Sequence, residues 1–334
     1  MYNVDLQREI ALEFVRVTEA AALKSSRCLG FGDKNMVDKA ATDAMRGMLD
    51  MINIRGTVVI GEGEKDHAPM LYIGEKVGEW KEDATEVDIA VDPVDGTRLV
   101  ANGLPNALSV VAAGSKGSLL PIPCFYMHKL ACGPWLKGKL DINASVRENL
   151  RVAAAALNKS IRDLTVVVLD RDRHSDLIQE IRQTGARIKL IGDGDVAGII
   201  ATALDDNPVD LYMGVGGAPE AVLAAAALRC LGGEIQSRFY IRNDDEKQKI
   251  LNAGFDLNKT YLTDDLAQSD DIIFAATGVT DGEFLKGVRF GSHKAKTYSV
   301  VMRARTRTVR YIEAIHNLDY KTVPSRELNQ EQQI

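Results

Sequence analysis

The sequence predicts an α/β fold whose first half is α+β in character. Two helical patterns precede several strands in the first half, and strands alternate with helices in the second half. Such alternation is typical of a largely parallel sheet flanked by helices. We therefore expect two domains, at residues 1–155 and 156–334, with the junction near residues 145–163.

Composition restricts the class of protein. The chain has 334 residues, a net charge of −6 and 26% charged residues, which argues against nucleic acid or a membrane surface as the main partner. The longest apolar run, near residues 221–231, is too short to span a bilayer, and no signal peptide is visible. The four cysteines lack metal-type spacing and are expected to be reduced thiols. We expect a soluble cytoplasmic protein.

The first half opens with two amphipathic helices. Apolar residues recur at three-to-four spacing over residues 5–28 and again over about 36–54. Asn35 is the expected N-cap of the second helix, which places Asp38 in its first turn. Asp38 is then either a charge that complements the helix dipole or a functional acid.

Strands follow these helices at residues 57–60, 87–92 and 106–114, with an acidic loop at 61–69. In the second of these strands, Val87, Ile89 and Val91 alternate with Asp88, Ala90 and Asp92. Pro93 is expected to end that strand, because proline has no N–H to donate to a ladder.

In the second half, expected strands alternate with expected helices. Strands are expected at residues 164–170, from 187, at 209–217 and, as a fourth, at 271–279. Helices are expected at 175–184, from 196 and from 218, the first of them ending at a C-cap glycine, Gly185.

Acidic residues follow the expected strand ends. In an open α/β sheet, functional groups gather at the carboxyl ends of strands. Two carboxylates as close as Asp92 and Asp95 repel unless one is protonated or a cation lies between them. Oxygen ligands without His or Cys suit Mg²⁺ or Mn²⁺. The acids at these ends are Glu62, Glu64, Asp92, Asp95, Asp193, Asp195 and Glu220.

Ordinary structural roles are open for several of these acids. Asp193 or Asp195 alone could be a turn residue that accepts backbone N–H groups, and Glu62 with Glu64 could be a solvated loop. The stretch D-P-V-D-G-T at 92–97 is different, because a plain turn needs no second acid, glycine and hydroxyl in that order.

Gly96 and Thr97 suit a phosphate and its attacking water. Glycine lets backbone N–H groups approach an anion, and a helix starting near Thr97 would point its amides at a phosphate. The Thr97 hydroxyl could orient a water, or it could simply cap the following helix.

Basic and aromatic groups form a complementary set. Arg171 and Arg173 follow the strand at 164–170 and suit phosphate oxygens, although they could also be solvated loop residues. Tyr126 could bond a phosphate or a sugar hydroxyl, or lie in the core. The lone histidines, His67, His128 and His174, are expected to be structural.

The motif D-P-x-D-G-T resembles the signature of the lithium-sensitive, metal-dependent sugar-phosphate and inositol-phosphate phosphatases. Five further segments narrow the resemblance to class II fructose-1,6-bisphosphatase over nearly the whole chain. These segments are GDKNMVDKAA, VVIGEGEKDHAPMLYIGEKVG, DRDRH, IGDGDVA and GVGGAPEAV. The resemblance implies a layered α/β/α/β/α sandwich, a homodimer or homotetramer, and a role in gluconeogenesis.

The resemblance also implies a role for each matching residue. The metal ligands would be Asp38, Glu62, Asp92, Asp95 and Glu220. Asp95, Gly96 and Thr97 would contact the reacting 1-phosphate, Thr97 would polarise the attacking water, and Asp66 would be a second water-activating candidate. The sugar and its 6-phosphate would be held by Tyr126, Arg171, Asp172, Arg173, Asp193, Gly194, Asp195 and Gly217.

Two positions depart from the family pattern. Asp172 stands where the family has proline, and an acid among phosphate-binding arginines weakens their hold on an anion unless its side chain turns outward. The cyanobacterial branch that also hydrolyses sedoheptulose-1,7-bisphosphate tends to carry Glu at the position of Asp95, so Asp95 favours fructose-1,6-bisphosphate. The alternatives are a dual bisphosphatase, an inositol phosphatase and a non-catalytic sugar-phosphate-binding regulator.

Overall fold

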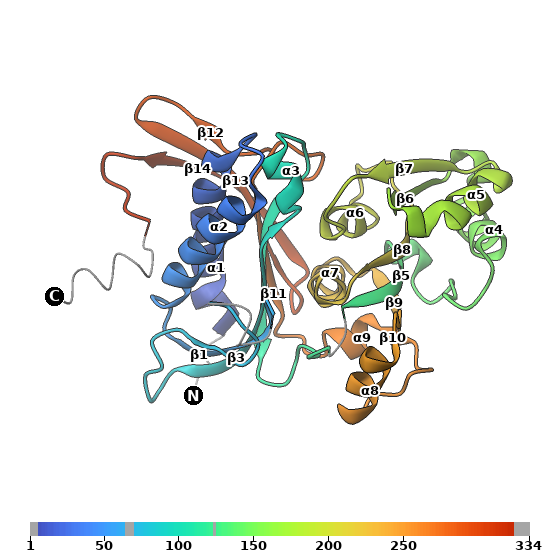
Figure 1. Ribbon diagram of the computed structural model, residues 1–334, viewed down its shortest axis with the longest axis horizontal. Coiled ribbons are helices and arrows are strands. Elements are labelled where there is room, and N and C mark those ends of the chain that lie inside the picture. The colour runs from blue at the N-terminus through green and yellow to red at the C-terminus, as the bar shows by residue number, and fades with distance from the viewer. Residues whose placement is uncertain (1–5, 64–69, 123–124, 324–334) are drawn as a thin grey trace. The chain divides into compact units, whose positions relative to one another are not determined.

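The computed structural model describes residues 6–63, 70–122 and 125–323 (Figure 1). The chain divides into two compact units, unit 1 with Met1–Leu119 and Ser269–Ile334 and unit 2 with Leu120–Gln268. This division lies elsewhere than the single cut at residues 155–156 expected from the sequence, because the chain returns to the first sheet after residue 269. Within the described ranges, no helix has the length and apolar character needed to cross a membrane.

Unit 1 combines helices with an eight-stranded sheet. Its helices are α1 (Leu6–Ser25), η1 (Ser26–Cys28), α2 (Lys34–Leu49) and α3 (Thr97–Ala101). Its strands are β1 (Ile54–Ile60), β2 (Lys76–Val77), β3 (Thr85–Asp95), β4 (Leu108–Ser115), β11 (Ile273–Gly278), β12 (Arg289–Phe290), β13 (Lys294–Arg303) and β14 (Thr308–Asn317).

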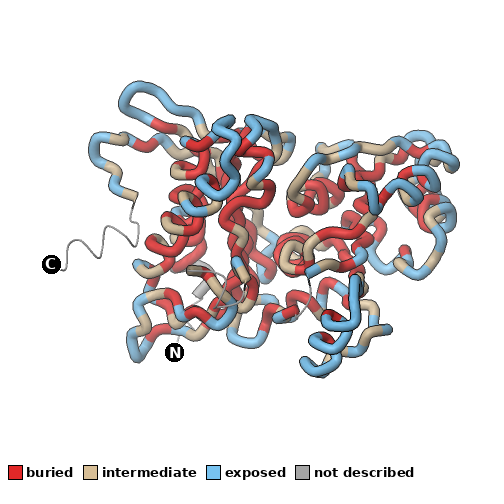
Figure 2. Tube along the Cα trace, viewed as in Figure 1, coloured by how far each residue is buried: buried red, intermediate tan, exposed pale blue. Residues whose placement is uncertain are grey.

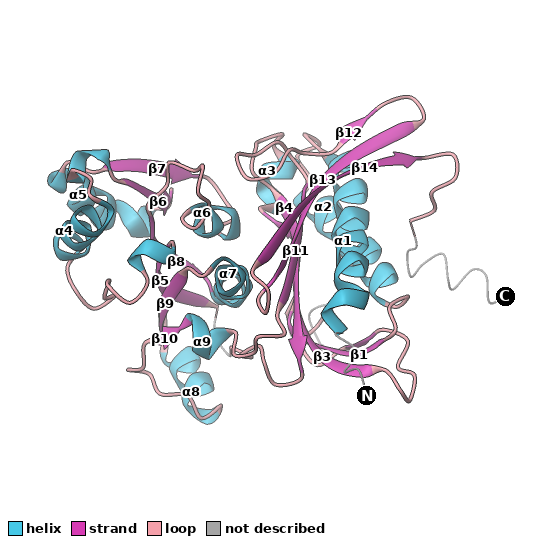
Figure 3. Cartoon of the chain, turned by 180° about the vertical axis from the view of Figure 1, so that it is seen from behind, coloured by secondary structure: helices cyan, strands magenta, loops and turns pink. Residues whose placement is uncertain are grey.

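The sheet of unit 1 is mixed. Its strand order is β12-β13-β11-β4-β3-β1-β2, with β14 paired to β13. The β1–β3 pair is parallel, whereas β3–β4, β4–β11 and β11–β13 are antiparallel. The segment expected as a fourth strand of the second-half sheet is therefore β11 of unit 1, and that prediction was wrong. Figure 3 shows β11 beside β13 from behind.

Helices α1 and α2 cover one face of this sheet (Figures 1 and 3). Their apolar stripes meet the strands in one core cluster, to which Phe14, Met45, Val58, Ile89 and Val301 contribute. Figure 2 shows the buried residues on both sides of this contact. Burial of large apolar side chains is the main stabilising term in such a layer.

Helix α2 differs from its expected bounds. Asp33, and not Asn35, is the N-cap, because its side chain accepts the N–H groups of Asn35 and Met36 at 2.9 and 3.1 Å. Asp38 therefore lies in the second turn. The helix ends at Leu49, since Ile54 already pairs with Thr85 in the sheet. Ile52 follows the helix and is also buried, so the spacing of apolar residues in the sequence continues beyond the end of α2.

Pro93 does not end β3, contrary to the sequence prediction. The parallel ladder with β1 stops at the pair Ile60–Ala90, and the register with β4 shifts between Asp92 and Asp95. Pro93 thus lies where neither neighbour requires its missing N–H, and proline is tolerated at such irregularities.

Unit 2 contains a six-stranded sheet with helices on both faces. Its strands are β5 (Tyr126–Cys132), β6 (Thr165–Leu169), β7 (Arg187–Ile191), β8 (Leu211–Gly217), β9 (Glu234–Phe239) and β10 (Tyr261–Leu262). Its helices are η2 (Pro134–Leu136), α4 (Val146–Leu157), η3 (Ile161–Asp163), η4 (Asp172–His174), α5 (Ser175–Thr184), α6 (Val196–Ala201), α7 (Ala218–Leu231), α8 (Asp244–Asn252) and α9 (Thr263–Leu266).

The sheet of unit 2 is mixed, with the order β10-β9-β5-β8-β6-β7. Only β6 runs parallel to β7 and β8, whereas β5 is antiparallel to both β8 and β9. The expected largely parallel sheet was wrong, because β5 enters from residues that were assigned to the first half. Helices α4 and α5 lie on one face, and α6 and α7 on the other (Figures 1 and 3). The predicted α/β class with helices layered on sheets is confirmed.

Candidate active site

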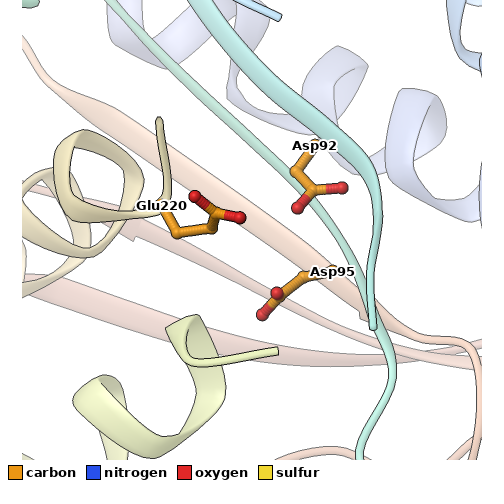
Figure 4. A group of neighbouring side chains, drawn as sticks. All are labelled: Asp92, Asp95 and Glu220. Carbon is orange, nitrogen blue, oxygen red and sulfur yellow. The ribbon is translucent and has the colours of Figure 1, made fainter. Parts of the chain in front are cut away.

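Asp92 and Asp95 project from the end of β3 (Figure 4). One carboxylate oxygen of Asp92 lies within 4.8 Å of one of Asp95. Asp92 Oδ1 also accepts the N–H of Val94 at 3.0 Å, which holds its side chain against the irregular turn. The predicted proximity of these two carboxylates is confirmed, and the pair could hold a metal ion.

Gly96 turns the chain from β3 into α3. Its φ of +94° lies in the left-handed region, and an added Cβ would lie 2.8 Å from Leu99 Cδ1. Only glycine adopts this conformation without strain. Helix α3 begins at Thr97, as predicted, but Gly96 is the N-cap, so the interpretation of Thr97 as a cap was wrong.

Thr97 is hydrogen-bonded to Asp38 of α2. Partial burial raises the pKa of the Asp38 carboxyl, and the hydrogen bond from Thr97 acts in the opposite direction. The two residues are 59 positions apart in sequence, and the packing of α2 on α3 and β3 brings them together. Asp38 is therefore a partner of the D-P-V-D-G-T turn and more than a helix-end charge.

The acidic loop after β1 is described only in part. Glu62 is exposed, and its N–H donates to Leu71 O at 3.0 Å. Glu64, Asp66 and His67 lie outside the described residues.

Glu220 lies in the first turn of α7 in unit 2 (Figure 4). Its Oε2 is buried and has no hydrogen-bond partner within the described parts of the chain. Burial raises the pKa of the Glu220 carboxyl, Lys129 opposes this rise, and Asp195 adds to it. Gly217 leaves space for the carboxylate, because a Cβ there would lie 1.9 Å from Glu220 Oε2.

Asp195 is the N-cap residue of α6, but its side chain accepts no N–H group of that helix, so the interpretation as a turn residue that accepts backbone N–H groups was wrong for it. Its Oδ2 pairs with Lys129 Nζ of β5 at 2.7 Å and accepts the hydroxyl of Tyr212 of β8 at 2.9 Å. Burial is the first cause that raises the pKa of Tyr212, and the Asp195 carboxylate is the second. Asp195 is thus the centre of a buried polar cluster on the α6 and α7 side of the sheet.

Asp193 and Arg171 neutralise each other at the carboxyl ends of β7 and β6. Arg171 Nη2 lies 2.6 Å from Asp193 Oδ1, and both side chains are about one-quarter exposed. Gly194, between the two acids, has a φ of +63°, which glycine adopts readily. Asp172, at the start of η4, is exposed to solvent.

Arg173 and Tyr126 meet next to this edge. Arg173 donates from Nη2 and Nε to Val215 O at 2.8 and 3.2 Å, and its guanidinium lies 5.2 Å from the Tyr126 ring centroid. Arg242 lies 5.0 Å from the same ring. Two guanidinium groups therefore converge on Tyr126, which is half-buried rather than in the core.

His174 is structural, as predicted. Its Nε2 accepts the N–H of Val215 at 2.7 Å, so Nδ1 carries the proton and donates to Leu169 O at 2.7 Å. Burial lowers the pKa of this imidazole and favours the neutral form. His174 and His128 also line a cavity of about 340 Å³ between the sheet and helices α4 and α5.

Sequence reasoning missed Lys129, Tyr212 and Arg242. Lys129 carried a usable signal, because it is a lysine inside a strand whose next three residues, LAC, are all apolar. Burial of a lysine requires an acidic partner, which points to an internal ion pair. Tyr212 and Arg242 carried no comparable signal.

Each unit contains acids of the kind that bind a hard divalent cation. Unit 1 offers the paired carboxylates of Asp92 and Asp95, and unit 2 offers a buried carboxylate oxygen of Glu220 that lacks a described partner. Oxygen ligands of this kind suit Mg²⁺ or Mn²⁺. Carboxylates, a hydroxyl and arginines at sheet edges of an α/β fold are the groups of a metal-assisted phosphatase.

Comparison with known proteins agrees with this class. The family model described as bacterial fructose-1,6-bisphosphatase, glpX-encoded, matches residues 8–316, and the chain belongs to this family of phosphatases. It is 47% identical over 329 residues to fructose-1,6-bisphosphatase 1 class 2 of Escherichia coli strain K12, covering 95% of this chain and 97% of the relative. The class 2 enzymes of Escherichia coli O6:H1 and Shigella flexneri match with the same identity and coverage.

Proposed function

We propose that this chain hydrolyses the 1-phosphate of fructose-1,6-bisphosphate to give fructose-6-phosphate and phosphate, with Mg²⁺ or Mn²⁺ as cofactor. The observation that carries the proposal is the D-P-V-D-G-T turn, where Asp92 and Asp95 form a carboxylate pair next to Thr97. Membership of the bisphosphatase family supports the same reaction. The proposed metal ligands are Asp38, Glu62, Asp92, Asp95 and Glu220.

When bound, the metal would supply charge stabilisation at the phosphate oxygens and the leaving alkoxide. The proposed roles of Asp95, Gly96 and Thr97 are to hold the 1-phosphate over the turn. The reaction forms a bond from a water oxygen to phosphorus and breaks the bond from phosphorus to the oxygen on C1, and that oxygen takes up a proton.

Thr97 is proposed to orient the attacking water. Its single O–H is within reach of the Asp38 carboxylate and of Val94 O, the latter at 3.5 Å, and donation to either acceptor leaves the lone pairs of Thr97 Oγ1 for a water hydrogen. A water that donates to Oγ1 presents its own lone pair in another direction, which is the requirement for in-line attack. Asp66 is proposed as a further group that activates this water.

The sugar and its 6-phosphate are proposed to bind in unit 2. The residues are Tyr126, Arg171, Asp172, Arg173, Asp193, Gly194, Asp195 and Gly217. The convergence of Arg173 and Arg242 on the Tyr126 ring supports a phosphate position there, because guanidinium groups suit phosphate oxygens. Asp172 is exposed, so water screens its charge and weakens the repulsion that its sequence position suggested.

Phosphate release tests the function and the substrate together. Fructose-1,6-bisphosphate, sedoheptulose-1,7-bisphosphate and inositol-1-phosphate are compared at equal concentration with Mg²⁺ or Mn²⁺. We expect the fructose substrate to have the highest kcat/KM, because Asp95 stands where the dual-specificity branch tends to carry Glu. Equal rates on both bisphosphates would establish a dual enzyme, preference for inositol-1-phosphate an inositol phosphatase, and binding without release a regulator. A cytoplasmic location and a homodimer or homotetramer remain predictions.

A further inference from the structure

Lys129 is a fully buried cation in the middle of β5. Its side chain has 0% exposure, and that of Asp195, its partner, has 2%. Taking two charges out of water is costly, and the pair is stable only when its geometry is good and its remaining lone pairs are satisfied. An ion pair buried this deeply does not serve solubility, so we looked for another role for it.

The Asp195 carboxylate is satisfied on one oxygen only. Oδ2 receives both Lys129 Nζ and the Tyr212 hydroxyl, at 2.7 and 2.9 Å. Oδ1 is buried and has no hydrogen-bond partner in the ranges that the structure describes. Buried carboxylate oxygens without a partner are costly in a folded protein, so Oδ1 is a natural acceptor for a ligand donor.

The backbone of β8 leaves space for this arrangement. A Cβ at Gly216 would lie 1.9 Å from Asp195 Oδ2 and 2.9 Å from Lys129 Nζ. Gly216 pairs with Met127, and Gly214 pairs with Lys129, so β8 carries glycine at both positions beside the ion pair. Residues from β5, from β8 and from the position just before α6 thus determine where the carboxylate lies.

We propose that Lys129 is a positioning residue, which holds Asp195 through Oδ2 so that Oδ1 accepts a hydrogen bond from a sugar hydroxyl. This inference rests on the proposed function and assigns Asp195 to the sugar rather than to the 6-phosphate. An ionised carboxylate repels a phosphate and has no hydrogen to give it, whereas a hydroxyl supplies the donor that Oδ1 lacks. Tyr212 shares the positioning role.

Binding of fructose-6-phosphate by calorimetry tests the inference, because this ligand has the sugar and lacks the reacting phosphate. Lys129→Met should weaken its binding, and raise KM for fructose-1,6-bisphosphate, by about 10- to 100-fold, the usual loss for a hydrogen bond to a charged group. The value of kcat should change by no more than about threefold. Lys159→Met is the matched control, because Lys159 pairs with Asp210 elsewhere in unit 2 and should leave both constants unchanged.

The double variant Lys129→Met/Asp195→Asn separates folding from binding. Without an uncompensated buried carboxylate, it should recover thermal stability relative to Lys129→Met, and its affinity should stay low. If Lys129→Met does not fold, Tyr212→Phe removes the second donor to Oδ2 and should raise KM severalfold. A folded Lys129→Met or Tyr212→Phe with wild-type KM and affinity would overturn the inference, even if the wild type hydrolyses the substrate. A wild type that neither hydrolyses the bisphosphate nor binds the product would instead overturn the proposed function.

Discussion

Replacing Gly217 with alanine displaces the Glu220 carboxylate with little change in the backbone. Gly217 has φ −60° and ψ 140°, a conformation that alanine also adopts without strain. The added Cβ would lie 1.9 Å from Glu220 Oε2 and 2.5 Å from its carboxylate carbon. The perturbation therefore acts on the end of one side chain.

The size of the displacement follows from these distances. Ordinary contact begins near 3.4 Å, so the carboxylate oxygen must withdraw by about 1.5 Å. A misplacement of about 1 Å in a catalytic constellation can cost about 100-fold in rate. We expect kcat/KM for fructose-1,6-bisphosphate to fall by about 100-fold. The free energy of unfolding should stay within about 1 kcal/mol of wild type, because glycine-to-alanine changes at compatible positions are neutral or slightly stabilising.

The assay combines phosphate release, Mn²⁺ titration by calorimetry and urea unfolding. Glu220→Gln and the double variant Gly217→Ala/Glu220→Gln provide the controls. If alanine acts only through Glu220, the double variant should be no worse than Glu220→Gln, so the two losses should not add. Wild-type activity in Gly217→Ala would refute the reasoning, and fully additive losses would show that Gly217 acts by another route.

Two further predictions concern unit 1. Burial, and to a smaller extent the charge of Lys321, lowers the pKa of His316 from 6.5 to about 4. Between these two pH values the imidazole is therefore protonated in the unfolded chain and neutral in the folded chain. Stability should therefore be flat above pH 6.5 and fall towards pH 4, and His316→Gln should make that fall shallower in urea titrations. Arg46 Nε lies 2.6 Å from Glu75 Oε1, and both side chains are at most 7% exposed. Arg46→Met should lower the free energy of unfolding by about 3–5 kcal/mol, and Arg46→Met/Glu75→Gln by clearly less; equal losses in urea unfolding would contradict an ion-pair role.

Local signals in the sequence predicted the turn at the site and several helix ends correctly. Gly96 before α3 and Gly185 after α5 are both in the left-handed conformation, which is a property of one residue and its neighbours. The closeness of Asp92 and Asp95 was also predictable, because only two residues separate them at a strand end. Asp38 was assigned only by resemblance, since its contact with Thr97 depends on how α2 packs.

Strand partners and buried polar contacts could not be predicted in this way. Strand β11 joins β4, about 160 residues earlier in the chain, and no local pattern reports such a pairing. Lys129 of β5 meets Asp195, 66 positions later and just before α6, and no local pattern in the sequence indicates that contact. The predicted end of β3 at Pro93 was wrong, because proline interrupts a strand only where a neighbouring strand needs its N–H.

The most direct test of the metal-site proposal compares wild type with Asp95→Asn in phosphate release from fructose-1,6-bisphosphate. The comparison includes chelated samples, samples restored with Mg²⁺ or Mn²⁺, and calorimetric titration of the same metals. We predict that wild-type activity is lost on chelation and restored by metal, and that Asp95→Asn, though folded, shows weakened metal binding and no measurable release. Wild-type release that survives chelation, or an Asp95→Asn variant that works at the wild-type rate, would contradict the proposed metal site.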